Sequence, residues 1–160
     1  MSEIVSFTDW TWIIGVLGLV VAFLIYGYVK RQPSGSDLMI DLADQIHDGA
    51  MAFLRKEYTF LMVFVVIVAV LLGLAIGPQT SIAYIAGALS SILAGFFGMK
   101  AATRANVRTS AAANTDGAGK ALRIAFFGGA VMGLAVASLG LLGLGSFYVI
   151  FASDAVPGPN

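Results

Sequence analysis

The stretch IAYIAGALSSILAGFFGMKAATRANVRT, residues 82–109, decides the fold. Residues 82–99 carry no charge, and a helix needs about 20 apolar residues, at ~1.5 Å each, to cross the hydrocarbon core of a bilayer. Lys100, Arg104 and Arg108 then follow at intervals of four, which aligns them on one side of a helix. The stretch therefore predicts a membrane-spanning helix that continues beyond the membrane with a line of positive charge.

The composition of the whole chain agrees with a membrane protein. Of its 160 residues, 59% are hydrophobic and 11% are charged, whereas soluble domains carry roughly 25% charged residues. The formal net charge is zero, so composition indicates no attraction to nucleic acid. The absence of cysteine excludes disulfides, thiolate metal sites and cysteine nucleophiles.

Apolar runs at residues 12–29, 58–76, 82–99 and 124–151 predict four transmembrane helices. The last run is longer than a span needs, so it either tilts or ends with its aromatic residues at the interface. The segment before the first run has no Lys or Arg, which argues against a signal peptide. We expect an all-α membrane protein in which residues 1–160 form a single membrane domain.

The distribution of positive charge predicts the orientation of the chain. Lys and Arg concentrate in cytoplasmic loops of membrane proteins. We therefore expect residues 30–57 and 100–123 in the cytoplasm, both chain ends outside, and a multi-pass location in the plasma membrane. The three cations after residue 99 serve first as a topology anchor. All nine basic residues lie in those two segments: Lys30, Arg31, Arg55, Lys56, Lys100, Arg104, Arg108, Lys120 and Arg123.

The segment before the second span predicts an amphipathic helix that runs into that span. Ser34 and Asp37 have the spacing of a helix start, and apolar residues recur at helical spacing from Leu38 onward. His47 is the only histidine, and without a visible partner it receives no catalytic role. A tight cation site gathers ligands from a folded loop or several elements, so we interpret the acidic side as solvated rather than as a metal site. Its members are Asp37, Asp41, Asp44 and Asp48.

The segment between the third and fourth spans begins as an alanine-rich helix and then turns at NTDGAG, residues 114–119. Its GAGKA stretch, residues 117–121, weakly resembles a phosphate-binding loop. That motif requires glycine where Asn114 stands and Ser or Thr where Ala121 stands, and it follows a strand. We reject the phosphate-loop interpretation.

The spans themselves lack the residues on which ion paths usually depend. None of the four runs contains Asp, Glu, Lys, Arg or His, which also argues against a small multidrug exporter with an intramembrane carboxylate. Small residues do recur every fourth position, which predicts close packing against other helices, either of this chain or of a larger body. These ladders are Ala83, Gly87, Ser91 and Gly95, and Ala125, Gly129, Gly133 and Ala137.

Three segments, taken together, resemble the integral-membrane pyrophosphatases, which are pyrophosphate-energised proton or sodium pumps. They are IHDGAMAFLRKEY (46–58), AGFFGMKAATRANVRT (94–109) and GKALRIAFFGGAVMGLAVASLGLLGLG (119–145). The resemblance implies an all-helical fold of about sixteen transmembrane helices in two concentric rings, assembled as a homodimer. It also implies Mg²⁺-pyrophosphate hydrolysis coupled to ion export, at Asp- and Lys-containing motifs on inner-ring helices.

By this resemblance the chain is the N-terminal fragment that carries the first four, outer-ring helices. We expect no catalytic, cofactor-binding or metal-binding residue in it, with pyrophosphate and Mg²⁺ bound by helices that follow. The 160 residues alone should not hydrolyse pyrophosphate. The choice between proton and sodium, and any dependence on K⁺, stay open. The remaining pump helices and the lipid bilayer are the expected partners, and nucleic acid is not.

The resemblance also assigns the three aligned cations to pairing with acidic neighbours, such as Asp41, Asp44 or Asp48, rather than to pyrophosphate. Two alternatives stay open. One is a non-catalytic four-helix packing or assembly protein, and the other is a module that binds anionic lipid through its basic loop.

Overall fold

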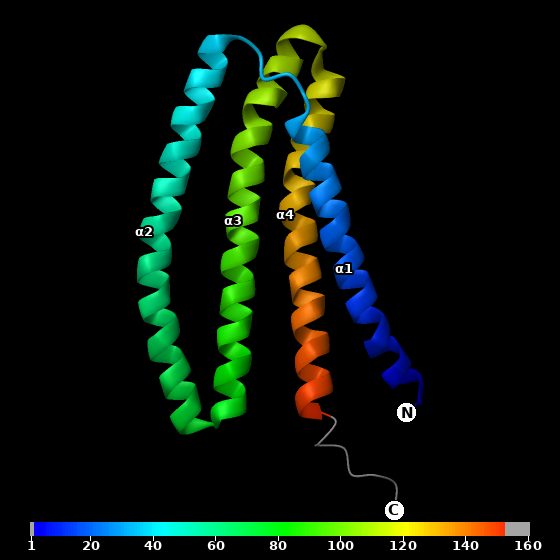
Figure 1. Ribbon diagram of the computed structural model, residues 1–160, viewed down its shortest axis with the longest axis vertical. Coiled ribbons are helices and arrows are strands. Elements are labelled where there is room, and N and C mark those ends of the chain that lie inside the picture. The colour runs from blue at the N-terminus through cyan, green and yellow to red at the C-terminus, as the bar shows by residue number, and fades with distance from the viewer. Residues whose placement is uncertain (1, 153–160) are drawn as a thin grey trace, which may run out of the picture.

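The computed structural model describes residues 2–152, with side chains described for residues 10–151. All of its regular structure is helical, so the all-α prediction is confirmed for this part of the chain (Figure 1). All four α-helices are long and apolar enough to cross a membrane. They are α1 (Ser2–Lys30), α2 (Asp37–Ala75), α3 (Pro78–Thr115) and α4 (Ala118–Phe147), and a π-helical turn, η1 (Tyr148–Ala152), continues α4.

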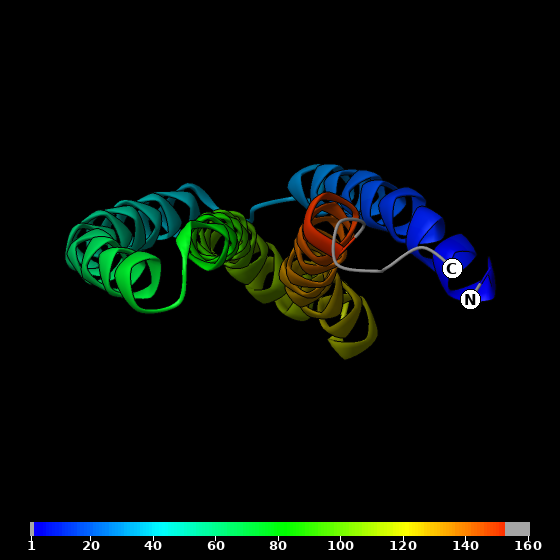
Figure 2. The same ribbon diagram turned by 90° about the horizontal axis from the view of Figure 1, so that it is seen from below.

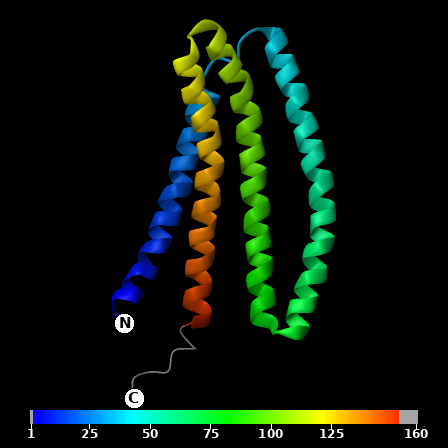
Figure 3. The same ribbon diagram turned by 180° about the vertical axis from the view of Figure 1, so that it is seen from behind.

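The four helices stand side by side in the spatial order α2, α3, α4, α1 (Figures 1 and 2). The main packing is of α3 along α4, α1 along α4 and α2 along α3. The start of α1, the end of α4 and the α2–α3 turn lie at the same end of the molecule (Figure 3). The opposite end, which we call the polar end, carries the α1–α2 connection and the α3–α4 turn.

The long amphipathic segment and the second span are one continuous helix, as predicted, but the predicted start of that helix was wrong. Ser36, and not Ser34, is the N-cap of α2, and its Oγ accepts a hydrogen bond of 3.4 Å from the Met39 N–H. Gly35 has a positive φ of 87°, a conformation that favours glycine. The chain therefore turns between Ser34 and the helix, which moves the cap past the turn.

Glycine residues allow the two short connections between helices, the α2–α3 turn and the α3–α4 turn. Gly77 (φ 145°) and Gly117 (φ 89°) adopt backbone conformations that residues with a Cβ rarely take. Their amides donate to the carbonyls of Leu72 (3.1 Å) and Ala112 (2.9 Å), which closes the ends of α2 and α3. The turn predicted at residues 114–119 is thus present.

A cluster of buried apolar residues lies toward the polar end, where α1, α3 and α4 meet. Val29 and Ile124 are almost completely buried there, against the small side chains of Ala105, Ala112 and Ala121. Elsewhere large apolar side chains stay exposed, as with Phe23 (75%) and Leu74 (83%). Such exposure is expected of helices in lipid, because acyl chains are as apolar as the side chains.

Neither small-residue ladder forms a continuous contact face among the described residues: on α3, Gly87 and Ser91 are exposed, and a Cβ added to Gly87 would meet nothing within 4 Å. The α4 ladder, at residues 125, 129, 133 and 137, is exposed in the described part of the chain. The adjacent face of α4 packs instead, and a Cβ added to Gly128 would lie 2.5 Å from the Ala105 Cβ on α3. On α3, Gly95 leaves room for the Tyr58 hydroxyl, which donates to the Ile92 carbonyl (3.0 Å) and joins α2 to α3.

Candidate functional site at the polar ends of α1, α2 and α3

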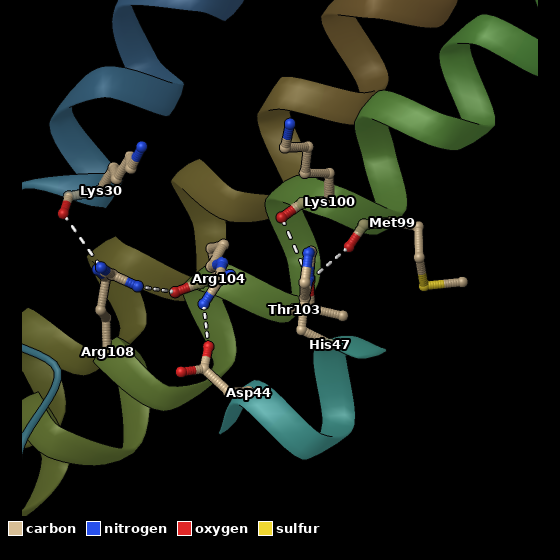
Figure 4. Close-up of polar contacts among 8 residues, drawn as sticks. All are labelled: Lys30, Asp44, His47, Met99, Lys100, Thr103, Arg104 and Arg108. Atoms are coloured by element: carbon tan, nitrogen blue, oxygen red, sulfur yellow. Dashed lines mark hydrogen bonds and ion pairs between the residues drawn. The ribbon is translucent and has the colours of Figure 1, made fainter. Parts of the chain in front are cut away.

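The three aligned cations of α3 do not share one function, because each meets a different neighbour (Figure 4). Arg108 lies beside the end of α1, Arg104 faces α2, and Lys100 lies nearer to the apolar part of α3. We call the contacts around Arg104, Arg108 and Thr103 the polar junction. It is the largest group of polar contacts between different helices in the part of the chain that the structure describes.

Arg108 holds the carboxyl end of α1. Its Nε donates to the Gln32 carbonyl (3.1 Å) and its Nη2 to the Lys30 carbonyl (3.2 Å). The last carbonyls of a helix have no partner within the helix and carry the negative end of its dipole. A guanidinium presents several donors in a fixed plane and stays charged at neutral pH. Its third bond, from Nη1 to the Arg104 carbonyl (2.7 Å), fixes the side chain on α3.

Arg104 joins α3 to α2 through an ion pair with Asp44. The Nη1–Oδ1 distance is 2.6 Å, and the two side chains are 32% and 53% exposed. The expected pairing of the cation line with the acidic side of α2 is therefore present, at one of the three candidate aspartates. Because both partners reach solvent, this pair contributes only about 0–1 kcal/mol.

His47 has a partner that the sequence did not reveal. Its Nδ1 lies 2.7 Å from the Oγ1 of Thr103, a largely buried hydroxyl on α3. The same hydroxyl lies 3.0 Å from the Met99 carbonyl and 3.3 Å from the Lys100 carbonyl. When the single hydroxyl proton is donated to one of these carbonyls, the oxygen accepts from the Nδ1–H of the histidine. His47 thus acts as a second link between α2 and α3.

Lys100 makes no ion pair within the described residues. Its ammonium lies 5.8 Å from the centroid of the Phe96 ring, close enough for a cation–π contact. The side chain runs back along α3, away from Arg104 (Figure 4). It also lines a groove of about 400 Å³ between α1, α3 and α4.

The remaining candidates are also placed by the structure. Lys120 of the GAGKA stretch pairs with Asp116 (3.1 Å) in the α3–α4 turn, and no strand precedes it in the described chain. Hydrogen bonds from Lys120, and next from Thr115, hold the pKa of the Asp116 carboxyl below its usual value. On α2, Asp41 accepts from Gln45 (2.9 Å). Among the described side chains, no three His, Asp or Glu residues are arranged to hold a metal ion.

Taken together, these contacts join α3 to α1 and α2. The Arg108 guanidinium donates hydrogen bonds to backbone carbonyls, and the Arg104 guanidinium pairs with a carboxylate. Both partners of the His47–Thr103 pair lie within the segments on which the family resemblance rests.

Comparison with known proteins identifies the family of the chain. The family model described as inorganic H⁺ pyrophosphatase matches residues 16–158. The chain belongs to this family.

Its relatives among the inorganic pyrophosphatases include both proton and sodium pumps. A Clostridium tetani protein, provisionally named a K(+)-stimulated pyrophosphate-energized sodium pump, is 49% identical over 81% of this chain and 19% of its own length. The Pyrobaculum aerophilum K(+)-insensitive pyrophosphate-energized proton pump is 42% identical, over 88% and 20%. The Thermotoga maritima K(+)-stimulated pyrophosphate-energized sodium pump is 40% identical, over 87% and 19%. The chain spans about a fifth of the length of these curated relatives.

Proposed function

We propose that this chain forms the N-terminal, outer-ring portion of an ion-translocating inorganic pyrophosphatase. The complete protein would couple hydrolysis of Mg²⁺-pyrophosphate to export of a proton or sodium ion, and it would act as a homodimer. The observation that carries the proposal is the family match over residues 16–158. The relatives named as proton or sodium pumps support it. Family membership favours this function over a non-catalytic four-helix protein.

We further propose that the polar end of the molecule lies in the cytoplasm and that both chain ends lie outside, in a plasma membrane. The spans would be residues 12–29, 58–76, 82–99 and 124–151, with residues 30–57 and 100–123 as cytoplasmic segments. Two observations support this orientation. All nine Lys and Arg residues lie in those two segments, and both helix connections of the polar end belong to them (Figure 1).

Within such a pump, this chain would act as a scaffold. We propose that the catalytic residues and the Mg²⁺ site belong to other helices of the pump, as does any K⁺ site. The absence of ionisable residues from all four apolar runs supports this assignment. The engagement of Arg104 and Arg108 in contacts between helices supports it as well.

Pyrophosphate hydrolysis in membranes that contain only these 160 residues tests the assignment. The assay includes Mg²⁺, with and without K⁺, and the full-length Thermotoga maritima pump serves as a positive control. We expect no hydrolysis by the chain beside an active control. Mg²⁺-dependent hydrolysis by the chain alone would contradict the scaffold role and direct attention to Lys100.

The orientation has a separate test, because the chain has no native cysteine. Single cysteines at Thr80 and Ala113 place one reporter beside each end of α3. In right-side-out vesicles, a membrane-impermeant maleimide should label Thr80→Cys and should reach Ala113→Cys only after the vesicles are opened. The reverse pattern would overturn the proposed orientation.

A further inference from the structure

The groove that ends at Lys100 has the features of a lipid site. Leu19 and Phe23 of α1, Phe97 of α3 and Val131 of α4 contribute to its apolar lining. Phe23 and Phe97 are 75% and 49% exposed. Tyr26 and Lys100 are the polar and charged side chains of its lining. The groove therefore has a volume of about 400 Å³ and a mainly apolar lining, with one ammonium group and one hydroxyl group.

The position of Lys100 along α3 places this cation at the membrane boundary. It is the first charged residue after the uncharged run 82–99, and Tyr26 lies one helical turn before the last residue of α1. The apolar residues of the groove extend from there into the spans. This depth suits a phospholipid, whose acyl chain lies in the hydrocarbon core while its phosphate stays at the interface.

Lys100 also differs from the other two cations in its line. Arg104 and Arg108 each donate hydrogen bonds to acceptors on the protein. The Lys100 ammonium lies over the Phe96 ring and forms no ion pair with a carboxylate among the described residues. A further transmembrane helix laid over the groove would bury this ammonium, which is costly without a counter-charge. A lipid phosphate supplies that counter-charge and leaves the pair in contact with water.

We propose that the groove between α1, α3 and α4 binds an anionic phospholipid, with an acyl chain along Phe23 and Phe97 and the headgroup phosphate on the Lys100 ammonium. The Tyr26 hydroxyl is a second donor for the headgroup. Basic pockets between helices on the cytoplasmic side recognise anionic headgroups through this combination of charge and apolar surface. The site goes beyond the proposed function, and it depends on the proposed orientation only for the choice of leaflet.

Native mass spectrometry of the detergent-solubilised protein measures the headgroup preference. Phosphatidylglycerol is titrated against phosphatidylcholine, and bound lipids are counted. A cation near the membrane surface contributes enough attraction to anionic lipid that Lys100→Gln should weaken binding of the first phosphatidylglycerol about fivefold. Lys120→Gln removes the same charge from the α3–α4 turn and is the matched control. Equal loss in both variants, or no loss in Lys100→Gln, would overturn the site.

The apolar wall is tested by Phe97→Ala, with Phe126→Ala on α4 as its control. Phe126 is 70% exposed and lies outside the groove lining, so both changes remove an exposed ring that contacts another ring. Only Phe97→Ala should weaken phosphatidylglycerol binding. Since Phe97 and Lys100 are both exposed, neither variant removes core packing, and the two variants test the site independently.

Photo-crosslinking identifies the occupant in the membrane itself. A benzophenone amino acid replaces Phe23 in the protein as expressed in cells, and adducts are separated by mass. A phospholipid adduct that diminishes when Lys100→Gln is added would support the proposal. A predominantly protein adduct would overturn it, because it would mean that another helix covers the groove.

Discussion

Replacement of Arg108 by glutamine should release the carboxyl end of α1. The guanidinium makes two bonds to carbonyls beyond its own helix, at 3.1 and 3.2 Å. Hydrogen bonds to charged groups contribute roughly 1.5–3 kcal/mol each. Both bonds are long and the side chain is only partly buried, so we reduce each contribution to about 1 kcal/mol. The local loss is then about 2 kcal/mol, or about thirtyfold in the opening equilibrium.

Two amides report directly on this opening. The Arg31 N–H donates to the Gly27 carbonyl (3.2 Å) and the Gln32 N–H to the Val29 carbonyl (3.1 Å). Both bonds close the final turn that Arg108 holds in place. Amide hydrogen exchange measures local opening free energies, so exchange at these two positions should accelerate about thirtyfold in Arg108→Gln.

Two further variants distinguish the effect of the Arg108 hydrogen bonds from a general effect of charge. Lys120→Gln removes a cation from the α3–α4 turn and should leave both amides unchanged. Arg108→Lys keeps the charge, but one ammonium cannot reproduce the planar set of donors, so it should give an intermediate acceleration. If Arg108→Gln changed exchange less than twofold, the two cross-helix bonds would contribute almost nothing and the reasoning would be refuted.

Two other contacts are open to test by unfolding in graded detergent mixtures. Gly128→Ala places a Cβ 2.5 Å from that of Ala105 and should destabilise the protein by about 1–3 kcal/mol. Gly129→Ala adds a Cβ that faces open space and should leave the stability unchanged. Adding Ala105→Gly to Gly128→Ala removes the close contact and should restore the stability. Thr103→Val removes the hydroxyl partner of His47 and should cost about 1 kcal/mol. In the His47→Leu variant, Thr103→Val should lower the stability by less than it does in the unchanged protein. An equal loss of stability in both proteins would show that the two residues are not coupled.

The sequence was sufficient for the helices and for part of the polar junction. Long uncharged runs have few alternatives to a membrane helix. Apolar residues at helical spacing from Leu38 onward and the alanine-rich segment after residue 99 indicated that α2 and α3 extend beyond their spans. Opposite charges on two such extensions also made a pair between Arg104 and an aspartate of α2 predictable. The choice of Asp44 among three candidates depends on how α2 packs on α3, which is a tertiary property.

Other contacts left no signal in the sequence. Arg108 binds backbone carbonyls, and every residue has a carbonyl, so no residue type marked its partner. His47 and Thr103 are 56 positions apart, and neither residue indicates the other. The packing face of α4 was placed one residue away from its true position, because glycine and alanine occur on several sides of that helix. Only the approach of Ala105 identifies Gly128 as the contact.

The heights at which the neighbouring helices end explain why an even line of cations acquired three different partners. Helix α1 ends at Lys30 while α3 continues to Thr115. Lys100 lies beside an apolar groove that the last turns of α1 help to form, and it pairs with no carboxylate among the described residues; its proposed partner is a lipid phosphate. Arg104, one turn further, faces the acidic side of α2. Arg108 lies beyond the end of α1 and meets unpaired carbonyls. Moving the end of α1 by one turn would therefore change which α3 cation can reach its terminal carbonyls, although the spacing of the cations would stay the same.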